Sequence, residues 1–317
     1  MKRRSFLKGG LGTALAGPLL GAVQEGKFEA AADVLAKATA EGRVHAASLF
    51  VSQGATEFAR SSGAAASPDA IFLLASVTKT MTAAALLTLY DAGRFGLDDP
   101  VEKHLPEFKD GSRSRVTIRH LLTHVSGLPD QLPENQNLRR RHAGLPAFVE
   151  GALRTPLLFE PGTRYGYSSM GILLASEIAR RISGTGFLEF MDKVVFQPLG
   201  MKQSALGLGR FKLGDTMRGQ VERAAPESGA GDPAAKEWDW TSPYWRTLGA
   251  PWGTAHGSAP DVARFLAEFL HPRGKLMKPE TVRLMVRNHN PAGFAPRGLG
   301  FGVGSGASTP RAATAAR

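Results

Sequence analysis

Residues 70–90 read AIFLLASVTKTMTAAALLTLY, with a serine and a lysine three positions apart near the middle. Lys79 is the only charged residue between Asp69 and Asp91, and its neighbours are apolar or small. The second half of the stretch has helical periodicity and strong helix formers, so we predict a helix that begins at Ser76 and ends near the next glycine. The two polar residues then share one face of its first turn.

The first turn of an apolar helix is a costly place for a lysine. The helix dipole disfavours a cation there, and apolar neighbours favour the uncharged amine. A neutral amine beside a hydroxyl is a general base beside a nucleophile. The pattern is short, however, and a second copy at Ser5 and Lys8 stands where no catalysis is expected. The spacing alone therefore leaves a catalytic and a structural role open.

The composition limits the class of protein. The chain has 317 residues, enough for one large domain or two smaller ones with a substantial core. It has no cysteine, which excludes disulfides, a thiol nucleophile and thiolate metal ligands. The net charge is +11, and its surplus is scattered apart from a basic cluster at 139–142. No aromatic residues are interleaved there, so we interpret the charge as favouring solubility or an anionic envelope, and we expect no nucleic-acid partner.

Residues 1–23 are predicted to be an export signal and not part of the fold. Residues 3–8, Arg-Arg-Ser-Phe-Leu-Lys, resemble a twin-arginine signal peptide. The weakly apolar run 11–23 that follows is too short and too rich in glycine to span a membrane stably. We expect the twin-arginine machinery to export the chain, which would make it periplasmic or secreted. A basic, disordered N-terminus is the alternative.

Residues 24–317 are predicted to form a single domain with both helices and strands, in which about residues 77–240 are mostly helical. No internal repeat is found. The predicted helices are 28–41, 76–92, 145–154, 168–182, 186–195, 259–270 and 281–287, and the predicted strands are 45–52, 56–62 and 297–303.

Tyr167 is a second candidate for the chemistry. It lies in a connecting segment just before the predicted helix 168–182, where site residues often stand. A tyrosine near a positive helix end and a lysine ionises more easily and could share proton transfer with Lys79. The structural alternative is a half-buried aromatic ring, with Ser168 or Ser169 capping the helix. The residues alone leave both alternatives open.

A series of motifs resembles the family of serine β-lactamase-like hydrolases, which holds class C β-lactamases, penicillin-binding carboxylesterases and D-amino-acid-specific peptidases. The motifs follow the family's order and spacing over about residues 28–303. They are Ser76-Val77-Thr78-Lys79, then 97–101, 116–129, 160–163 with Tyr167-Ser168, 198–201, 257–261 and 298–301.

The resemblance implies an α+β, β-lactamase/penicillin-binding-protein-like fold, with an antiparallel sheet flanked by helices and a mostly helical subdomain. It implies Ser76 as the acylated nucleophile in the cleft between them, Lys79 as its base and Tyr167 as the tyrosine of the Y-x-N motif. The asparagine of that motif is replaced here by Ser169, which we expect to contact substrate. The implied reaction is hydrolysis of an ester, amide or β-lactam through an acyl-enzyme. Neither a metal nor an organic cofactor is implied.

One family motif is missing from the sequence. The K-T-G, H-x-G or W-x-G strand should follow residues 298–301 by a few dozen positions, and no such strand is predicted before the chain stops. Residues 252–254 and 256–258 have a similar composition but come too early, and we predict that both are loop. We therefore expect a truncated or frameshifted member, with a sheet that is incomplete at its C-terminal side and impaired activity.

Other classes of protein fit less well. His120 and His124 are four apart, but the glutamate of the zinc-protease pattern and a third ligand are missing, so we predict structural histidines. The sequence lacks the G-x-S-x-G of α/β-hydrolases and any Walker-type loop. The remaining alternative is a non-catalytic member that binds peptidoglycan-like or peptide ligands without turnover. The sequence does not predict the substrate or the oligomeric state.

Overall fold

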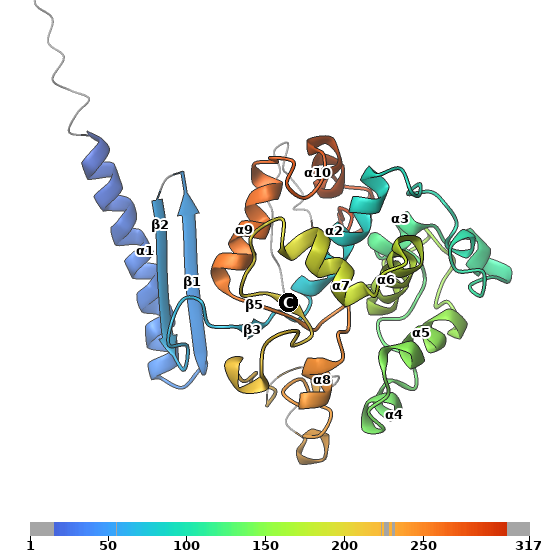
Figure 1. The fold of residues 1–317 in the computed structure, drawn as a ribbon, viewed down its shortest axis with the longest axis horizontal. Coiled ribbons are helices and arrows are strands. Elements are labelled where there is room, and N and C mark those ends of the chain that lie inside the picture. Colours follow the sequence, from blue (N-terminus) through green and yellow to red (C-terminus); the bar gives the residue numbers. More distant parts are fainter. Residues whose placement is uncertain (1–15, 55, 223, 225–227, 230–231, 303–317) are drawn as a thin grey trace, which may run out of the picture. The chain divides into compact units, whose positions relative to one another are not determined.

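The computed structural model describes residues 16–302 except 55, 223, 225–227 and 230–231. The chain divides into two compact units, residues 1–68 and 69–317 (Figure 1). Most of the predicted signal lies outside the described residues. The signal over 1–23 and the single domain over 24–317 stay predictions.

The first unit is a helix packed on a β-hairpin. The strands pair antiparallel along their whole length, and the rings of Phe28 and Phe58 join helix to hairpin with centroids 5.6 Å apart. The predicted helix and strands are confirmed, but the helix begins within the segment predicted to be a leader. The bounds are α1 Ala16–Ala40, β1 Ala46–Gln53 and β2 Thr56–Gly63.

The second unit is mostly helical. Its α-helices are α2 Val77–Asp91, α3 Ile118–Leu122, α4 Asn135–Arg140, α5 Leu145–Arg154, α6 Ser169–Ser183, α7 Phe187–Met191, α8 Pro243–Thr247, α9 Ala259–Leu270 and α10 Pro279–Val286. Shorter turns of helix are η1 Val101–Lys103, η2 Gly111–Arg115, η3 Asp192–Phe196, η4 Leu213–Asp215 and η6 Pro233–Ala235. The strands are β3 Phe72–Leu73, β4 Ala205–Leu206 and β5 Ala255–Gly257.

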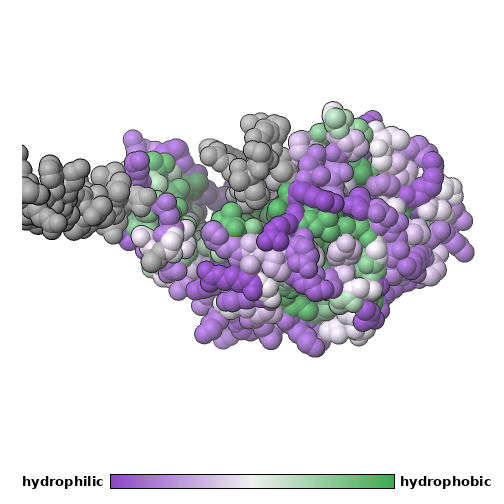
Figure 2. All heavy atoms as spheres, turned by 90° about the horizontal axis from the view of Figure 1, so that it is seen from above, coloured by the Kyte–Doolittle hydropathy of each residue, from purple (hydrophilic) through white to green (hydrophobic). Residues whose placement is uncertain are grey.

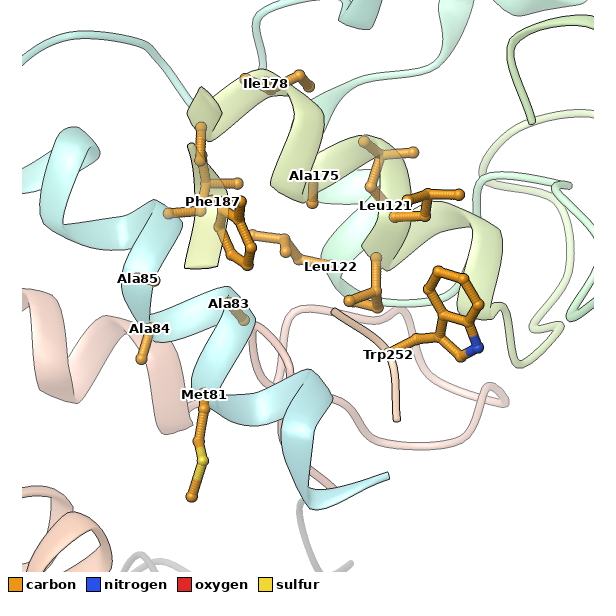
Figure 3. Packing of buried hydrophobic residues seen from close by; sticks show 14 of the residues in the cluster. Met81, Ala83, Ala84, Ala85, Leu121, Leu122, Ala175, Ile178, Phe187 and Trp252 are labelled. Atoms are coloured by element: carbon orange, nitrogen blue, oxygen red, sulfur yellow. The ribbon is translucent and has the colours of Figure 1, made fainter. Parts of the chain in front are cut away.

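The core of this unit is built around α2, which is buried over most of its length. The helix packs against α6, and α6 in turn packs against α3, α5 and α7. Figure 3 shows side chains of α2, α3, α6 and α7 meeting in this core, with Trp252 beside them. The run Ala83–Ala85 permits close approach of the neighbouring helices, while each fully buried leucine contributes about 1.5–3 kcal/mol. Helix α2 is thereby a rigid support for the residues at its N-terminus.

Three short strands stand beside the start of α2. Strand β5 lies in the middle, paired antiparallel with β3 and with β4. The prediction that residues 256–258 are entirely loop is therefore wrong, because His256 and Gly257 belong to β5. Its pairing partners Leu73 and Ala205 are far away in the sequence, so the local composition carries no sign of this strand.

The surface of the second unit is mostly hydrophilic in the view of Figure 2, with apolar areas between the polar side chains. Such a mixture is usual for the surface of a folded protein. Within the described residues, no helix combines the length and apolar character that crossing a membrane would require.

Gly127 offers a test of the packing. Its φ is +84°, and a Cβ there would lie far inside the contact distance of the Phe159 carbonyl oxygen. Gly127→Ala should therefore lower the free energy of unfolding by roughly 3 kcal/mol or more, from backbone strain and overlap together. Gly184→Ala is the control, because its φ of +72° is similar but the space around it is open. Urea unfolding followed by circular dichroism should show a loss of only about 1 kcal/mol in the control. Equal losses in the two variants would contradict this description of the packing.

Candidate active site

The side chains of Ser76 and Lys79 meet at the start of α2. Lys79 Nζ lies 3.1 Å from Ser76 Oγ and 2.9 Å from the carbonyl oxygen of Trp252. The lysine is only 5% exposed. Ser76 occupies the N-cap position, but its hydroxyl makes no capping hydrogen bond and stays available to the lysine. The predicted start of the helix and the predicted pairing of these residues are both found.

The segment before the nucleophile is held in a strained conformation. Ala75 has a φ of +45°, which is unfavourable for a residue with a Cβ. Thr78 Oγ1 donates to the Ala75 carbonyl at 2.6 Å and accepts from the Ala255 N–H at 3.0 Å. The Leu74 N–H donates to the Ala255 carbonyl at 2.8 Å. Strand β5 therefore fixes the turn that presents Ser76.

This arrangement suits a lysine acting as base. A neutral amine can donate one hydrogen to the Trp252 carbonyl while its lone pair accepts the hydroxyl proton of Ser76. The carbonyl thus orients the amine toward the serine. Strained backbone, a buried amine and a hydroxyl that bonds to this amine and does not cap the helix are typical of an activated nucleophile.

The backbone amide of Ser76 is also available. Within the described part of the chain, no acceptor is found for this N–H. A backbone N–H next to the attacking oxygen is one of the two donors that usually stabilise a tetrahedral oxyanion.

Tyr167 lies beside the pair. The Lys79 Nζ is 4.8 Å from the centroid of its ring, and the side chain is 38% exposed. Ser168, the next residue, caps α6, since its Oγ accepts from the Gly171 N–H at 2.9 Å and donates to the Pro129 carbonyl at 2.9 Å. The structure thus brings Ser76, Lys79 and Tyr167 together, while capping is done by Ser168.

Ser169 is placed differently from the other candidates. It is buried, and both its N–H and its hydroxyl donate to Asp130 Oδ1, at 2.9 and 2.5 Å. The expected contact of Ser169 with substrate stays a prediction, and the hydroxyl is engaged by Asp130. Sequence reasoning did not find the roles of Asp130 or of the Trp252 carbonyl, because both depend on contacts between distant segments.

The two histidines considered as metal ligands are bound to backbone amides. His120 Nδ1 accepts from the Thr117 N–H at 3.3 Å and completes a capping box for α3. His124 Nδ1 accepts from the Ser168 N–H at 3.2 Å. Among the described residues, no group of three or more histidines and carboxylates is arranged to hold a metal ion.

Burial keeps two histidines near the site neutral. Desolvation, helped by the nearby Lys79 and Arg297 charges, lowers the pKa of His124 to about 3. Desolvation and the neighbouring Arg246 lower the pKa of His256 to about 4. His256 Nδ1–H donates to the Gly207 carbonyl at 2.8 Å, which leaves Nε2 to accept from Arg246 at 3.2 Å. Protonation would break this arrangement.

The free energy of unfolding should therefore decrease as the pH is lowered. Between pH 6.5 and 5 the unfolded chain binds protons at His124 and His256 that the folded chain does not, so stability decreases as the pH falls. Each residue contributes up to about 1.4 kcal/mol per pH unit. His120 and His289, whose pKa values are also lowered by burial, act in the same direction.

Denaturant titrations at pH 7.5, 6.5, 5.5 and 5.0 test this expectation. Carboxylates with a lowered pKa act mainly at lower pH, so this window isolates the histidines. In His256→Asn the free energy of unfolding should decrease less between pH 7.5 and 5.0 than in the unaltered protein. Stability that is constant from pH 7.5 to 5.0 would contradict the buried neutral histidines.

Comparison with known proteins places the chain in a family. The family model described as Beta-lactamase matches residues 31–314, so the chain belongs to this family. The resemblance seen in the motifs and the expected fold class, mixed α+β of the β-lactamase/penicillin-binding-protein type, are both confirmed. Similar proteins include an esterase and an amidase, which supports a serine hydrolase.

Two curated relatives illustrate the similarity. Esterase EstB of Burkholderia gladioli is 33% identical over 274 residues, which cover 77% of this chain and 68% of the esterase. Protein flp of Staphylococcus aureus (strain MW2) is 27% identical over 186 residues, which cover 57% of this chain but only 37% of that protein. The chain thus matches about two thirds of one relative and little more than one third of the other.

Solved structures show the same fold. The D-amino acid amidase of Ochrobactrum anthropi SV3, complexed with L-phenylalanine amide, has a TM-score of 0.70 and 26% identity, over 86% of this chain and 79% of the amidase. The penicillin-binding protein homologue of Pyrococcus abyssi has a TM-score of 0.67 and 24% identity, over 87% of this chain and 64% of that one. EstCE1, a hydrolase with promiscuous acyltransferase activity, has a TM-score of 0.68 and 21% identity, over 89% of this chain and 84% of EstCE1. The last two similarities show the fold alone.

Proposed function

We propose that this protein is a serine hydrolase that cleaves carboxylic esters or amides through an acyl-enzyme on Ser76. The observation that carries the proposal is the buried Lys79 Nζ at 3.1 Å from Ser76 Oγ, on a helix packed into the core. A hydroxyl becomes a useful nucleophile when a base takes its proton, and Lys79 is placed to do so.

The reaction follows from this geometry. Lys79 takes the Ser76 proton while Oγ bonds to the substrate carbonyl carbon, and the Ser76 N–H stabilises the resulting oxyanion. The proton then passes to the departing alcohol or amine as its bond to carbon breaks, with Tyr167 beside Lys79 as a second group for the transfer. Water attacks the ester on Ser76 in the same way and releases the acid.

The names of the relatives favour esters and amides as the substrate class. One similar protein is an esterase and another is a D-amino acid amidase. A β-lactam is a cyclic amide and fits the same chemistry, so it belongs in the panel of test substrates.

Burst kinetics test the proposal. With p-nitrophenyl butyrate, an acyl-enzyme should give a first burst of nitrophenol equal to the enzyme concentration, followed by slower turnover. D-phenylalanine amide and a chromogenic cephalosporin complete the panel. Release no faster than in buffer for all three, with a folded protein, would refute the proposal and favour the non-catalytic alternative.

We also propose export through the twin-arginine machinery, with a periplasmic or secreted product. The support is the sequence Arg3-Arg4-Ser5-Phe6-Leu7-Lys8, which lies outside the described residues. A reporter fused after residue 30 should be exported only in cells with this machinery. The double variant Arg3→Lys, Arg4→Lys should leave the reporter in the cytoplasm. Export that does not depend on the machinery or the arginines would refute this proposal.

A further inference from the structure

His124 bonds to the backbone on both sides of Tyr167. Its carbonyl oxygen accepts from the Gly166 N–H at 2.9 Å, and its Nδ1 accepts from the Ser168 N–H at 3.2 Å. Gly166 and Ser168 are the two chain neighbours of the tyrosine. His124, on the turn after α3, therefore holds the backbone on both sides of a tyrosine more than forty positions away.

The imidazole also contacts the tyrosine ring itself. The ring centroids of His124 and Tyr167 are 4.7 Å apart with an interplanar angle of 41°. Tyr165 packs edge-on against the same imidazole at 6.2 Å and accepts a hydrogen bond from Arg297. His124 is only 4% exposed, whereas Tyr167 is 38% exposed. The partly exposed ring of Tyr167 thus packs against the buried imidazole of His124.

The backbone of His124 is adapted to this double contact. Its φ is +61°, which lies in the left-handed region. A histidine in this conformation is strained unless its surroundings compensate, and such strain is concentrated at functional sites. Here the compensation comes from the two hydrogen bonds and the ring contact with the segment 165–168.

The charge state of His124 fits the same role. Burial, Lys79 and Arg297 keep the imidazole neutral, with a pKa of about 3. The bond from the Ser168 N–H requires a lone pair on Nδ1, which places the proton on Nε2. A neutral ring adds no positive charge beside Lys79 and can keep both contacts over the pH range in which a lysine base works.

We propose that His124 is the positioning residue for Tyr167. It fixes the peptide bonds before and after the tyrosine and supports its ring, so that Tyr167 stays beside Lys79. The effect on catalysis rests on the proposed hydrolase function, whereas the effect on the segment 165–168 does not.

Two variants separate the hydrogen bond from the rest of the side chain. His124→Gly tolerates the positive φ but removes the imidazole and its acceptor. His124→Asn also tolerates this φ, and its Oδ1 stands close to the position of Nδ1, so the bond from Ser168 can be kept. The same two changes at His120 are the matched controls, because that ring also accepts from a backbone N–H, but from Thr117 and not from the segment 165–168.

Two readouts are needed. The first is kcat and KM for p-nitrophenyl butyrate. The second is amide hydrogen exchange of the segment 164–169, which does not depend on activity. His124→Gly should lower kcat about tenfold or more with KM within about threefold, since a small misplacement of a proton-transfer group is costly. Exchange in 164–169 should rise about tenfold. For His124→Asn, kcat and the exchange rate of 164–169 should each stay within about threefold of the unaltered protein. Both His120 variants should leave kcat unchanged.

The outcomes are distinct. Unchanged exchange in a folded His124→Gly protein, or raised exchange with unchanged kcat, would overturn the proposal. If the unaltered protein hydrolyses none of the three test substrates, the hydrolase function fails, and exchange alone decides whether His124 holds the segment. If His124→Gly does not fold, His124→Asn decides, and a loss of kcat greater than tenfold in that folded variant would overturn the proposal.

Discussion

Ser76→Ala is expected to lower kcat/KM for p-nitrophenyl butyrate by roughly a thousandfold or more and to remove the burst. No other hydroxyl is expected to take its place, because Lys79 bonds directly to Ser76 Oγ and the turn that presents this oxygen is fixed by β5. The variant should remain folded, since the Ser76 hydroxyl makes no helix-capping bond. The loss should therefore appear in kcat without a comparable loss of thermal stability.

Ser183→Ala is the matched control for this experiment. Ser183 is the last residue of α6, and its hydroxyl bonds only to nearby backbone: it donates to the Arg180 and Thr185 carbonyls at 3.3 and 3.5 Å and accepts from the Thr185 N–H at 3.2 Å. Its removal should leave kcat/KM unchanged within about twofold. Ester hydrolysis by Ser76→Ala at more than one tenth of the original rate would contradict the assignment of the nucleophile.

Lys79→Met is expected to lower kcat by roughly a hundredfold to ten-thousandfold, which is the usual contribution of a general base. Methionine has a similar length but no basic nitrogen that could accept a proton, so the nucleophile stays in place without its base. The site is only 5% exposed, and an apolar side chain is well suited to it. The amine no longer has to be buried, but the Trp252 carbonyl loses its donor, so the free energy of unfolding should stay within about 2 kcal/mol of the unaltered protein while turnover is slow.

Lys103→Met tests whether the loss of any lysine has this effect. Lys103 pairs with Asp99 at 2.8 Å on the surface, with 55% of its side chain exposed. An exposed ion pair contributes little, so this variant should keep its kcat and nearly all of its stability. Equal rates in Lys79→Met and in the unaltered protein would show that another group is the base.

Much of the site could be predicted because its signals are local. An isolated lysine three positions after a serine, at the start of an apolar helix, predicts the pair that the structure brings together. The turn before α6 similarly predicts a tyrosine next to a capping serine. The bounds of α2, α5, α6, α9 and α10 agree within two residues for the same reason, since periodicity and capping residues lie within a few positions of each end, whereas α1 begins twelve residues before the predicted start.

The rest depends on contacts that only the folded chain makes. Strand β5 was predicted as loop because its three residues are strand only through pairing with β3 and β4. The bond from Ser169 to Asp130 and the carbonyl of Trp252 beside Lys79 also join distant segments. The sequence distinguishes His124 only by its spacing from His120, whereas its contacts in the fold are with the residues around Tyr167.

Intact mass after incubation with a fluorophosphonate, followed by peptide mapping, tests the central claim most directly. Fluorescent penicillin is used in parallel for the β-lactam class. We expect one adduct per chain, located on Ser76, absent in Ser76→Ala and formed much more slowly in Lys79→Met. A folded protein that forms no adduct with either reagent, or carries it on another residue, would contradict an activated serine at the start of α2.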